Sequence, residues 1–594
     1  MRWIKLYEAG VWEMSKSEKV FSLARRRGFF WPAYEIYGGT AGFYTWGPLG
    51  VLLKRKVKEL WRTMFIYNHG FLEIEGPSIA PEIVFQASGH VEGFKDVMVS
   101  CESCGAKYRA DKLLEERGVD APEGLSPEKY LELIVDNGIK CPVCGGELGD
   151  PGYFITMFKT TIGPYSNSIG YLRPETAQNM FVEFRRVYEA MHRKFPIGIA
   201  QIGRGYRNEI SPRQGVIRLR EFDMMEIEYF FDPEDEEFPW IDDMLDEELN
   251  ILHEELIKSG GGEYETISVR EALERGIIEY KSMAYFMALS HRFLEALGIP
   301  RSRQRFREKL EGERAHYAKK VFDQEVLLDR WGWVEVSGHA DRTVYDLSRH
   351  SEYSGKDITV ERRLKEPVKT VVSEAHPDPR KIKEVFGDKI GAIMRELSNM
   401  EPGDLYNIIM SKGYIEAAGV RLDKEMFRLS SREQYIEVKR IIPNVVEPSF
   451  GLDRIVYATL EYAYRERGDR VILSLPPYIA PIDAAVYPLL NKDELRSVAE
   501  DIVVNLEASG FKVYFDYGDS IGRLYARGDE IGIPVAFTVD MTTLKDDTVT
   551  VRDRDTWVQY RIPRDKALEF MERLVTGEAF EEICRSMGLR RVST

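Results

Sequence analysis

The sequence lacks several features that mark other protein classes. It contains no run of about 18 uncharged apolar residues, so no membrane-spanning helix and no membrane partner are expected. Residues 1–19 lack the apolar stretch of a secretory signal, and residues 1–13 read as a possible extended start ahead of Met14. There is no G-x-x-x-x-G-K-[ST] phosphate loop, no H-E-x-x-H metal motif and no internal repeat. These absences argue against a P-loop enzyme, a metalloprotease of that type and a repeat protein.

Cysteine is scarce, and acidic residues outnumber basic ones. Four of the five cysteines form two C-x-x-C pairs, which suits a reducing cytoplasm and a metal site better than disulfides. The 82 basic and 98 acidic residues give a net charge of −16, so bulk charge does not indicate a nucleic-acid partner, and any RNA must bind local basic patches. A length of 594 residues predicts about three to five globular domains.

An arginine-rich stretch, residues 203–230, is the most distinctive part of the chain. Its five arginines are Arg204, Arg207, Arg213, Arg218 and Arg220. Residues 217–222 alternate as in a strand, residues 206–209 read as a second extended piece, and residues 211–215 have the composition of a turn. Because arginine makes bidentate, permanently charged contacts with phosphate, this hairpin predicts a site for a nucleotide polyphosphate. The alternative is a charged, exposed hairpin.

The same stretch resembles motif 2 of the class II aminoacyl-tRNA synthetases, and within them the dimeric glycyl-tRNA synthetases of archaeal and eukaryotic type. The resemblance rests on Arg207-Asn208-Glu209 and Arg220-Glu221-Phe222. It implies that Arg207 is catalytic and holds the α-phosphate with the incoming carboxylate, that Glu209 contacts the adenine amino group, and that Phe222 stacks on the adenine. The implied ATP site also includes Asn208, Ile217, Arg218, Leu219, Arg220 and Glu221.

Residues 444–464 resemble motif 3 of that class. A strand pattern ends at Gly451, and Leu452-Asp453-Arg454 opens a helix. A helix start favours anions, so Arg454, with Gly451 and Asp453 beside it, is expected at the γ-phosphate. The resemblance makes Arg454 the second catalytic arginine.

Residues 331–346 resemble the family pattern E-x-x-G-x-A-x-R-x-x-Y-D-L, with a strand at 333–336 leading into a glycine turn. This match implies that Glu335 binds magnesium beside ATP, next to Val336.

The resemblance also implies a glycine site. The R-P-E-T-A-Q segment at residues 173–178 lies at a predicted strand-to-helix junction, where an acid favoured by the helix dipole is the alternative reading of Glu175. The implied glycine-binding residues are Arg109, Glu175, Glu226, Arg342, Glu447 and Ser449. The three acids would bind the ammonium, Arg342 the carboxylate, and Ser449 would crowd the Cα. Excluding larger amino acids by steric clash makes an editing domain unnecessary.

The two C-x-x-C pairs, Cys101 with Cys104 and Cys141 with Cys144, suit a structural zinc ion with four thiolate ligands. A helix predicted near residues 127–137 fills the long gap between the pairs.

Residues 48–68 read as a helix and residues 71–75 as a strand that ends at Gly76-Pro77. This pattern resembles motif 1 of the class and implies a homodimer. Residues 301–320 are strongly basic and read as a solvated helix face, or as a surface near RNA.

The predicted fold is α+β: a class II core, with an antiparallel sheet flanked by helices, a zinc-knuckle insertion, helical insertions and a C-terminal α/β anticodon-binding domain. The core comprises residues 1–100, 151–234, 326–360 and 431–475. The insertions are residues 101–150 with zinc, 235–325, which read as mainly helical, and 361–430. Leu475-Pro476-Pro477 reads as a linker to the domain at 476–594, whose Arg552, Arg554, Arg561 and Arg564 form a local basic hairpin.

The reaction that the resemblance implies is glycine–tRNA ligation. Glycine and ATP with Mg²⁺ give glycyl adenylate and pyrophosphate, and glycine is then transferred to the 3′ end of tRNA(Gly). Two alternatives stay open from the residues alone. One is a prolyl, threonyl or seryl synthetase. The other is a catalytically inactive, synthetase-like RNA-binding protein.

Overall fold

The computed structural model describes residues 14–119, 121, 125–164, 168–210, 212 and 214–592. The chain divides into two compact units: Thr359–Ile442 forms one, and the sequence before and after it forms the other. None of the described helices combines the length and the apolar character that a membrane crossing requires. Ser211 and Arg213 of the predicted turn, and the predicted extended start at residues 1–13, lie outside the described residues.

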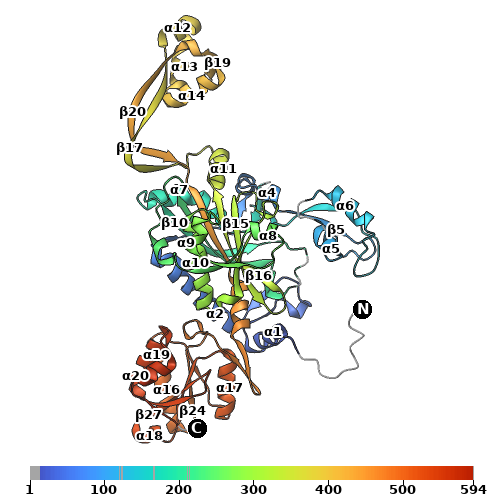
Figure 1. The fold of residues 1–594 in the computed structure, drawn as a ribbon, viewed down its shortest axis with the longest axis vertical. Coiled ribbons are helices and arrows are strands. Elements are labelled where there is room, and N and C mark those ends of the chain that lie inside the picture. The colour runs from blue at the N-terminus through green and yellow to red at the C-terminus, as the bar shows by residue number, and fades with distance from the viewer. Residues whose placement is uncertain are drawn as a thin grey trace. The chain divides into compact units, whose positions relative to one another are not determined.

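A nine-stranded sheet forms the centre of the first unit (Figure 1). Its strand order is β13-β12-β14-β15-β16-β21-β11-β10-β3, and all neighbours are antiparallel except β12 with β14 and β10 with β3. The strands are β3 (Leu72–Glu73), β10 (Ile197–Tyr206), β11 (Glu221–Phe231), β12 (Glu248–Leu252), β13 (Glu265–Ser268), β14 (Gln304–Glu308), β15 (Lys320–Leu328), β16 (Gly332–Thr343) and β21 (Asn444–Gly451).

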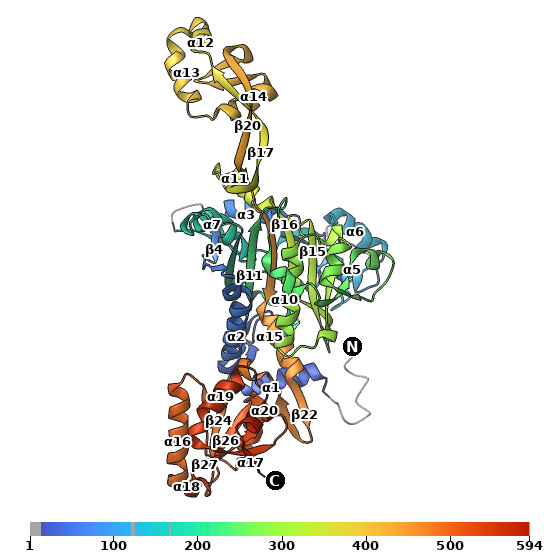
Figure 2. The same ribbon diagram turned by 60° about the vertical axis from the view of Figure 1, so that its left-hand side comes forward.

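The two faces of this sheet differ in chemistry because its strands alternate in sequence. Met225, Ile227 and Tyr229 of β11 join the main apolar core, whereas Glu226 and Glu228 point to the other face. On the apolar face, Phe450 of β21 lies 5.0 Å from Phe65 and 5.9 Å from Phe293, ring centre to ring centre. These rings come from η2 (Arg62–Ile66), which continues α2 (Pro48–Trp61), and from α10 (Lys281–Ala296); Figure 2 shows α2 and α10 beside the sheet. The opposite, polar face is therefore free to form a site.

Several predicted elements of the core are confirmed. Helix α1 spans Lys16–Arg27, and α2 begins with Pro48 in its first turn. Strand β9 (Ile169–Leu172) and helix α7 (Ala177–Ala190) flank the R-P-E-T-A-Q segment, and α15 (Leu452–Ala463) follows β21 directly. The remaining elements nearby are β1 (Phe30–Pro32), β2 (Tyr44–Trp46), β4 (Ile79–Pro81), β8 (Lys159–Thr161), α3 (Glu82–Ala87), α4 (His90–Gly93) and α11 (Tyr345–Ser354).

The motif 2 hairpin is longer at its base and less regular at its tip than predicted. Strands β10 and β11 pair from Ile197 opposite Phe230 to Tyr206 opposite Glu221. The predicted strand over residues 217–222 is wrong, because Gly215–Ile217 forms a 3-10 turn and β11 begins only at Glu221. The alternation there has another cause: Val216, Ile217 and Leu219 are buried from an irregular backbone. The glycine turn predicted after residue 336 is also wrong, since β16 continues through Gly338 to Thr343.

The prediction that residues 235–325 are mainly helical is wrong. They contain α8 (Glu254–Lys258), α9 (Val269–Glu274) and α10, but they also supply β12, β13, β14 and β15 to the central sheet. The basic segment 301–320 is likewise no helix face: it includes a 3-10 turn at Arg301–Arg303 and the strand β14. Its arginines pair with acids, as Arg305 does with Glu325 at 2.7 Å, so its charge is largely neutralised.

The second unit, Thr359–Ile442, has a core of its own. Strands β17 (Val360–Pro377) and β20 (Phe427–Ile441) form a long antiparallel ribbon. The chain between them forms α12 (Pro379–Phe386), α13 (Ile390–Leu397), α14 (Pro402–Lys412), β18 (Tyr414–Ala417) and β19 (Val420–Asp423). The predicted boundaries at 361 and 430 are therefore too narrow, because β20 returns along β17 and the central sheet resumes only at β21.

The local periodicity of residues 484–539 predicts the order β-α-β-α-β, and the structure confirms it. The elements are β24 (Ala484–Pro488), α16 (Asp493–Ala508), β25 (Val513–Phe515), α17 (Ile521–Ile531) and β26 (Val535–Val539). They are followed by α18 (Thr543–Asp546), β27 (Thr548–Asp553), β28 (Gln559–Pro563), α19 (Ala567–Val575), α20 (Phe580–Ser586) and β29 (Arg590–Arg591). Strands β22 (Tyr464–Arg467) and β23 (Arg470–Leu473) precede this domain as a hairpin.

Two expectations about this domain need correction. The segment around Pro476 is no free linker, because Leu475 and Ile479 are completely buried in the main core. The hairpin β27–β28 exists, but it is not a basic patch. Arg552 pairs with Asp529 at 2.8 Å and Arg561 with Asp540 at 2.7 Å. Arg554 and Arg564 also pair with acids.

Candidate active site

A cavity of about 280 Å³ lies on the polar face of the central sheet. Most residues of the predicted ATP and glycine sites line it, although they come from segments more than two hundred residues apart. Those that line it are Glu175, Arg207, Glu209, Ile217, Arg218, Leu219, Phe222, Glu226, Glu335, Val336, Glu447, Ser449, Gly451, Asp453 and Arg454. The cavity has a cationic, aromatic end and an acidic end.

Two arginines and one aromatic ring form the cationic end. Arg454, in the first turn of α15, donates from Nε to the Ile217 carbonyl at 2.9 Å, and from a terminal nitrogen to the Glu335 carbonyl at 2.8 Å. The guanidinium of Arg207 lies 5.5 Å from the centre of the Phe222 ring, a cation–π distance. This arrangement can hold phosphate oxygens beside an aromatic base.

Asp453, next to Arg454 in the sequence, bonds two other elements of the core. Its Oδ1 accepts from Lys54 Nζ at 2.6 Å, and its Oδ2 accepts from the backbone N–H of Asp223 at 2.7 Å. Lys54 also pairs with Asp223 at 2.9 Å. These bonds join α2, β11 and the start of α15, so they fix the position from which Arg454 projects.

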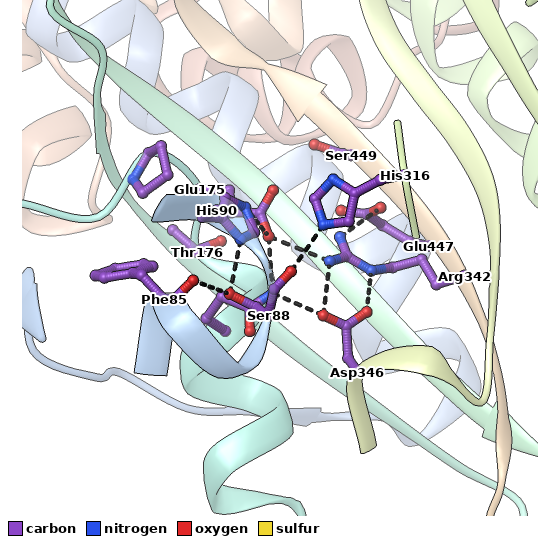
Figure 3. A network of polar contacts seen from close by, with 12 residues as sticks. Phe85, Ser88, His90, Glu175, Thr176, His316, Arg342, Asp346, Glu447 and Ser449 are labelled. Atoms are coloured by element: carbon purple, nitrogen blue, oxygen red, sulfur yellow. Dashed lines mark hydrogen bonds and ion pairs between the residues drawn. The ribbon is translucent and has the colours of Figure 1, made fainter. Parts of the chain in front are cut away.

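Three carboxylates bond one arginine at the acidic end (Figure 3). Arg342 is completely buried and bonds Glu447 at 3.0 Å, Glu175 at 3.2 Å and Asp346 at 2.9 Å. Glu226 accepts from the backbone N–H of Thr176 at 2.6 Å, from the Thr176 hydroxyl, and from Ser449 Oγ at 2.7 Å. We call Glu175, Glu226 and Glu447 the acidic cage.

The cage carboxyls differ in their affinity for protons. Burial raises the pKa of Glu447 to about 8; Arg342 opposes that rise, and Glu226 and Glu175 add to it. Burial and the neighbouring Glu175 also raise the pKa of Glu226. For Glu175, burial acts in the same direction, but Arg342 and His90 outweigh it and hold its pKa well below the usual value. The cage therefore attracts a cation that can displace its protons.

Arg342, predicted to bind the glycine carboxylate, is held by neighbouring acids. Its donors are bonded to three carboxylates, and it is not among the residues that line the cavity. The sequence pattern could not reveal this, because Asp346 lies one helical turn further on and Glu447 lies on another strand. Arg342 organises the cage and neutralises part of its charge.

Four other predicted residues also lie off the cavity wall. Arg220 donates to the carbonyls of Ala41 at 2.6 Å and Glu209 at 2.8 Å, so it fastens the hairpin tip. Glu221 pairs with Arg204. The backbone N–H of Asn208 donates to the Thr156 carbonyl at 2.6 Å, outside the cavity lining. Arg109 pairs with Asp111 at 2.7 Å in the cysteine-containing insertion.

Sequence reasoning missed several groups around the site. Lys309, Arg314, Tyr317 and Asp323 line the cavity from a segment that was read as part of a helical insertion. The strand alternation in residues 304–308 and 321–326 was the signal that could have placed them. Nε2 of His90 lies 3.3 Å from Oε1 of Glu175, and its Nδ1 lies 2.7 Å from Ser88 Oγ (Figure 3).

The four paired cysteines meet in space as predicted. Their sulfur atoms all lie within 4.8 Å of one another, with Cys101 and Cys144 at 3.5 Å and Cys104 and Cys141 at 3.7 Å. A tetrahedral ion with metal–sulfur bonds of 2.3 Å requires sulfur separations of about 3.8 Å, so the cluster is compatible with a metal site. The insertion around it comprises β5 (Lys95–Ser100), β6 (Lys107–Arg109), α5 (Ala110–Glu115), α6 (Pro127–Asp136) and β7 (Gly152–Ile155).

Comparison with known proteins places both main domains. A family model described as "tRNA synthetase class II core domain (G, H, P, S and T)" matches residues 166–461, and one described as "Anticodon binding domain" matches residues 483–574. The predicted class II core and C-terminal anticodon-binding domain are thereby confirmed.

Curated proteins resemble the chain over nearly its whole length. A glycine–tRNA ligase of Aeropyrum pernix is 48% identical over 573 residues, which is 95% of this chain and 98% of that protein. The glycine–tRNA ligase of Methanothrix thermoacetophila is 44% identical, over 95% of this chain and 98% of that protein. That of Methanocaldococcus jannaschii is also 44% identical, over 93% of this chain and 98% of that protein.

Proposed function

The chain belongs to the glycine–tRNA ligase family of class II aminoacyl-tRNA synthetases, and from this premise we propose how its cavity binds glycine and ATP. Its function is the ATP-dependent ligation of glycine to tRNA. Relatives that match at 44–48% identity over 93–95% of the chain do not favour a prolyl, threonyl or seryl enzyme, or an inactive relative.

ATP lies at the cationic end of the cavity. Phe222 stacks on the adenine and Glu209 accepts from its amino group, while Arg207 holds the α-phosphate. Arg218 and Arg454 bind the outer phosphates. The exposed carboxylate of Glu335, 3.2 Å from Arg454, is an oxygen ligand of the type that Mg²⁺ prefers, and a bound Mg²⁺ would neutralise phosphate charge there.

Glycine lies at the acidic end. Its ammonium is bound by the acidic cage, and this orients its carboxylate towards Arg207 and the α-phosphate. One observation carries this proposal. Three buried carboxyls, Glu175, Glu226 and Glu447, lie together on the cavity wall, and the other end of the cavity carries arginines. Arg342 neutralises only part of the charge of these three acids, and the ammonium is the cationic group that every amino acid can add.

The chemistry then needs positioning rather than a protein base. A carboxylate oxygen of glycine attacks the α-phosphorus, the bond to the bridging oxygen breaks, and pyrophosphate leaves with that electron pair. In the second step a hydroxyl at the 3′ end of tRNA attacks the glycyl carbonyl and AMP leaves as the new ester forms. Arg207 and Arg454 stabilise the charge that develops on the phosphates.

Selectivity for glycine depends on the space left beside the Cα at the acidic end. The ammonium and carboxylate are shared by all amino acids, so discrimination depends on space at the Cα, where Ser449 lies bonded to Glu226. A side chain there would have to displace this pair. Rejection of a larger substrate by clash is effective, which removes the need for editing.

Three further features belong to the proposal. The four-cysteine cluster holds a structural Zn²⁺, whose thiolate ligands suit a reducing compartment, the cytoplasm. The domain at residues 483–574 binds the anticodon arm of tRNA(Gly). Two copies of the chain associate through the region from Pro48 to Pro77, where Val51 and Tyr67 are exposed to 37% and 57%.

ATP–pyrophosphate exchange with each amino acid in turn tests this function. Exchange should depend on glycine and should be absent with alanine, serine, proline and threonine at equal concentration. Exchange supported by one of the others, but not by glycine, would overturn the proposed use of the acidic cage.

A further inference from the structure

One glycine of the central sheet has no conformational reason to be glycine. Gly338 lies in the interior of β16, outside the left-handed region, and a Cβ added there would meet no other atom within 4 Å. A strand interior is weakened by glycine, which offers no side chain to pack and has more freedom to lose on folding. A glycine inside a strand often marks a bulge, a tight bend, or a place where a ligand or another backbone approaches closely, and Gly338 itself pairs in register with Asp323 and Ser449.

The other glycines of the same sheet are explained by their surroundings. A Cβ at Gly198, Gly203 or Gly205 would come within 2.8 Å of Phe71, Arg173 or Phe222. Gly332 has a φ of +68° at the start of β16, and a Cβ at Gly451 would make ordinary contact with Val336 at 3.6 Å. Gly338 alone among these six combines an unstrained backbone with open space, and that space is the cavity, whose wall it forms.

The strand register shows what lies on either side of the open space. Asp323 of β15, Gly338 of β16, Ser449 of β21 and Glu226 of β11 are successive partners across four strands. All four line the cavity, and Gly338 is the member of this row without a side chain. Because neighbouring strands are about 4.8 Å apart, the backbones of Asp323 and Ser449 are separated by roughly 10 Å, with only the bare backbone of Gly338 between them.

Along β16, Gly338 lies between the two ends of the cavity. Glu335 and Val336 precede it at the cationic end, where Glu335 meets Arg454 at 3.2 Å. Ala340 follows it and is the strand partner of Glu447, at the acidic end. At 3.3–3.4 Å per residue, Val336 and Ala340 are each about 7 Å from Gly338 along the strand, and Glu335 is about 10 Å away.

We infer that the junction between the two reactants, the glycine carboxylate and the α-phosphate, lies directly on the backbone of Gly338, which is a glycine to leave room for it. This inference rests on the proposed function and adds to it a site residue that positions the reacting atoms. A methyl group at residue 338 would occupy the space where the new oxygen–phosphorus bond forms, yet it would disturb nothing within the protein.

The test compares Gly338→Ala with Gly152→Ala. Gly152 is also a strand glycine with an unstrained backbone and open space, but it is exposed in β7 and does not line the cavity. Both variants should unfold at the same temperature as the unsubstituted chain. Gly338→Ala should lower kcat/KM for glycine-dependent pyrophosphate exchange by about 100-fold, the loss expected from a displacement of about 1 Å, and Gly338→Val should lower it further. Gly152→Ala should leave it unchanged.

A binding measurement separates this inference from the function on which it rests. The probe is a non-hydrolysable glycyl-sulfamoyl adenosine, which spans both ends of the cavity, titrated calorimetrically. The unsubstituted chain and Gly152→Ala should bind it, and Gly338→Ala should bind it about 100-fold more weakly. Equal binding and equal exchange by Gly338→Ala would overturn the inference, as would a loss of thermal stability that accounts for the lost activity. Failure of the unsubstituted chain to bind the probe or exchange pyrophosphate would instead overturn the proposed function.

Discussion

Ser449 Oγ donates a 2.7 Å hydrogen bond to Oε1 of Glu226, directly across the paired strands β21 and β11. The other carboxylate oxygen accepts from Thr176, at the junction before α7. Glu226 is therefore held from two sides and presented to the cavity in one orientation. The bond joins two segments more than two hundred residues apart in the sequence, which makes the acidic cage a product of the sheet.

Replacing Ser449 by alanine should weaken glycine binding more than it weakens the fold. The substitution leaves Oε1 of buried Glu226 without its donor, so its charged form becomes less stable and the glycine KM should rise by about tenfold, with little change in the ATP KM. Steady-state pyrophosphate exchange measures both constants. Ser17→Ala is the control, because Ser17 is buried in α1 and bonded to the Tyr457 hydroxyl, and neither residue lines the cavity. A rise confined to the ATP KM would contradict the placement of glycine.

Glycine binding should release protons near pH 7. The pKa of Glu447 is about 8 in the free protein, so this carboxyl is mostly protonated at neutral pH, and an ammonium must displace that proton. Glycine affinity should therefore increase as the pH rises from 6 to 8, with release of up to about one proton per site. In the free protein the same group opposes folding increasingly as the pH rises from about 4.5 to 8, because the folded state binds the proton more tightly.

Calorimetric titration of glycine in two buffers of different ionisation enthalpy counts these protons. Glu447→Gln should reduce the release, since glutamine carries no ionisable proton at this position. Proton uptake on glycine binding, or an affinity that falls between pH 6 and 8, would contradict the assigned charge state of the cage.

The purified chain should contain one zinc ion. The four thiolates of Cys101, Cys104, Cys141 and Cys144 are close enough to share one tetrahedral ion, and binding of such an ion contributes to folding. Cys104→Ser should lose the metal and lower aminoacylation more than the melting temperature, because the insertion has a separate apolar core around Val99 and Leu114. Cys584→Ser should keep the zinc, as Cys584 is buried in the C-terminal domain. Elemental analysis that finds no zinc in metal-replete preparations would contradict this prediction.

The chain should be a dimer whose interface includes α2 and the turn that follows it. Val51→Asp combined with Tyr67→Asp places charge on two exposed apolar residues of this region and should shift sedimentation equilibrium towards the monomer at micromolar concentration. Val504→Asp is the control, since Val504 is 63% exposed on α16 of the C-terminal domain. A stable, fully active monomer of the unsubstituted chain would contradict the dimer.

The sequence predicts best those features that depend on neighbouring residues. The proline at residue 48 marks a helix start, and the β-α-β-α-β order after residue 478 follows from local periodicity. The four cysteines were also predictable, because metal ligands of one type are recognised by spacing alone.

The remaining features depend on contacts that no local pattern encodes. The strands between residues 248 and 328 join the central sheet through the pairing of β15 with β16, a contact that their own sequence does not encode. Their charged residues therefore suggested a separate helical insertion. Arg342 was expected to bind the substrate carboxylate, yet Asp346, Glu175 and Glu447 surround it. Gly338 was read as a turn because the space in front of it becomes visible only when β15, β16 and β21 are assembled.

The central claim is that the acidic cage binds the glycine ammonium while Arg454 serves the nucleotide, and one pair of variants tests it most directly. Glu447→Gln keeps an acceptor for Arg342 but removes the charge that this carboxyl carries once glycine is bound. A hydrogen bond to a charged group contributes about 1.5–3 kcal/mol, so the glycine KM in pyrophosphate exchange should rise roughly 10- to 150-fold while the ATP KM stays nearly constant. Arg454→Ala should instead raise the ATP KM and lower kcat. If Glu447→Gln raised the ATP KM and left the glycine KM unchanged, the carboxylate would belong to the nucleotide half of the site and the account would be contradicted.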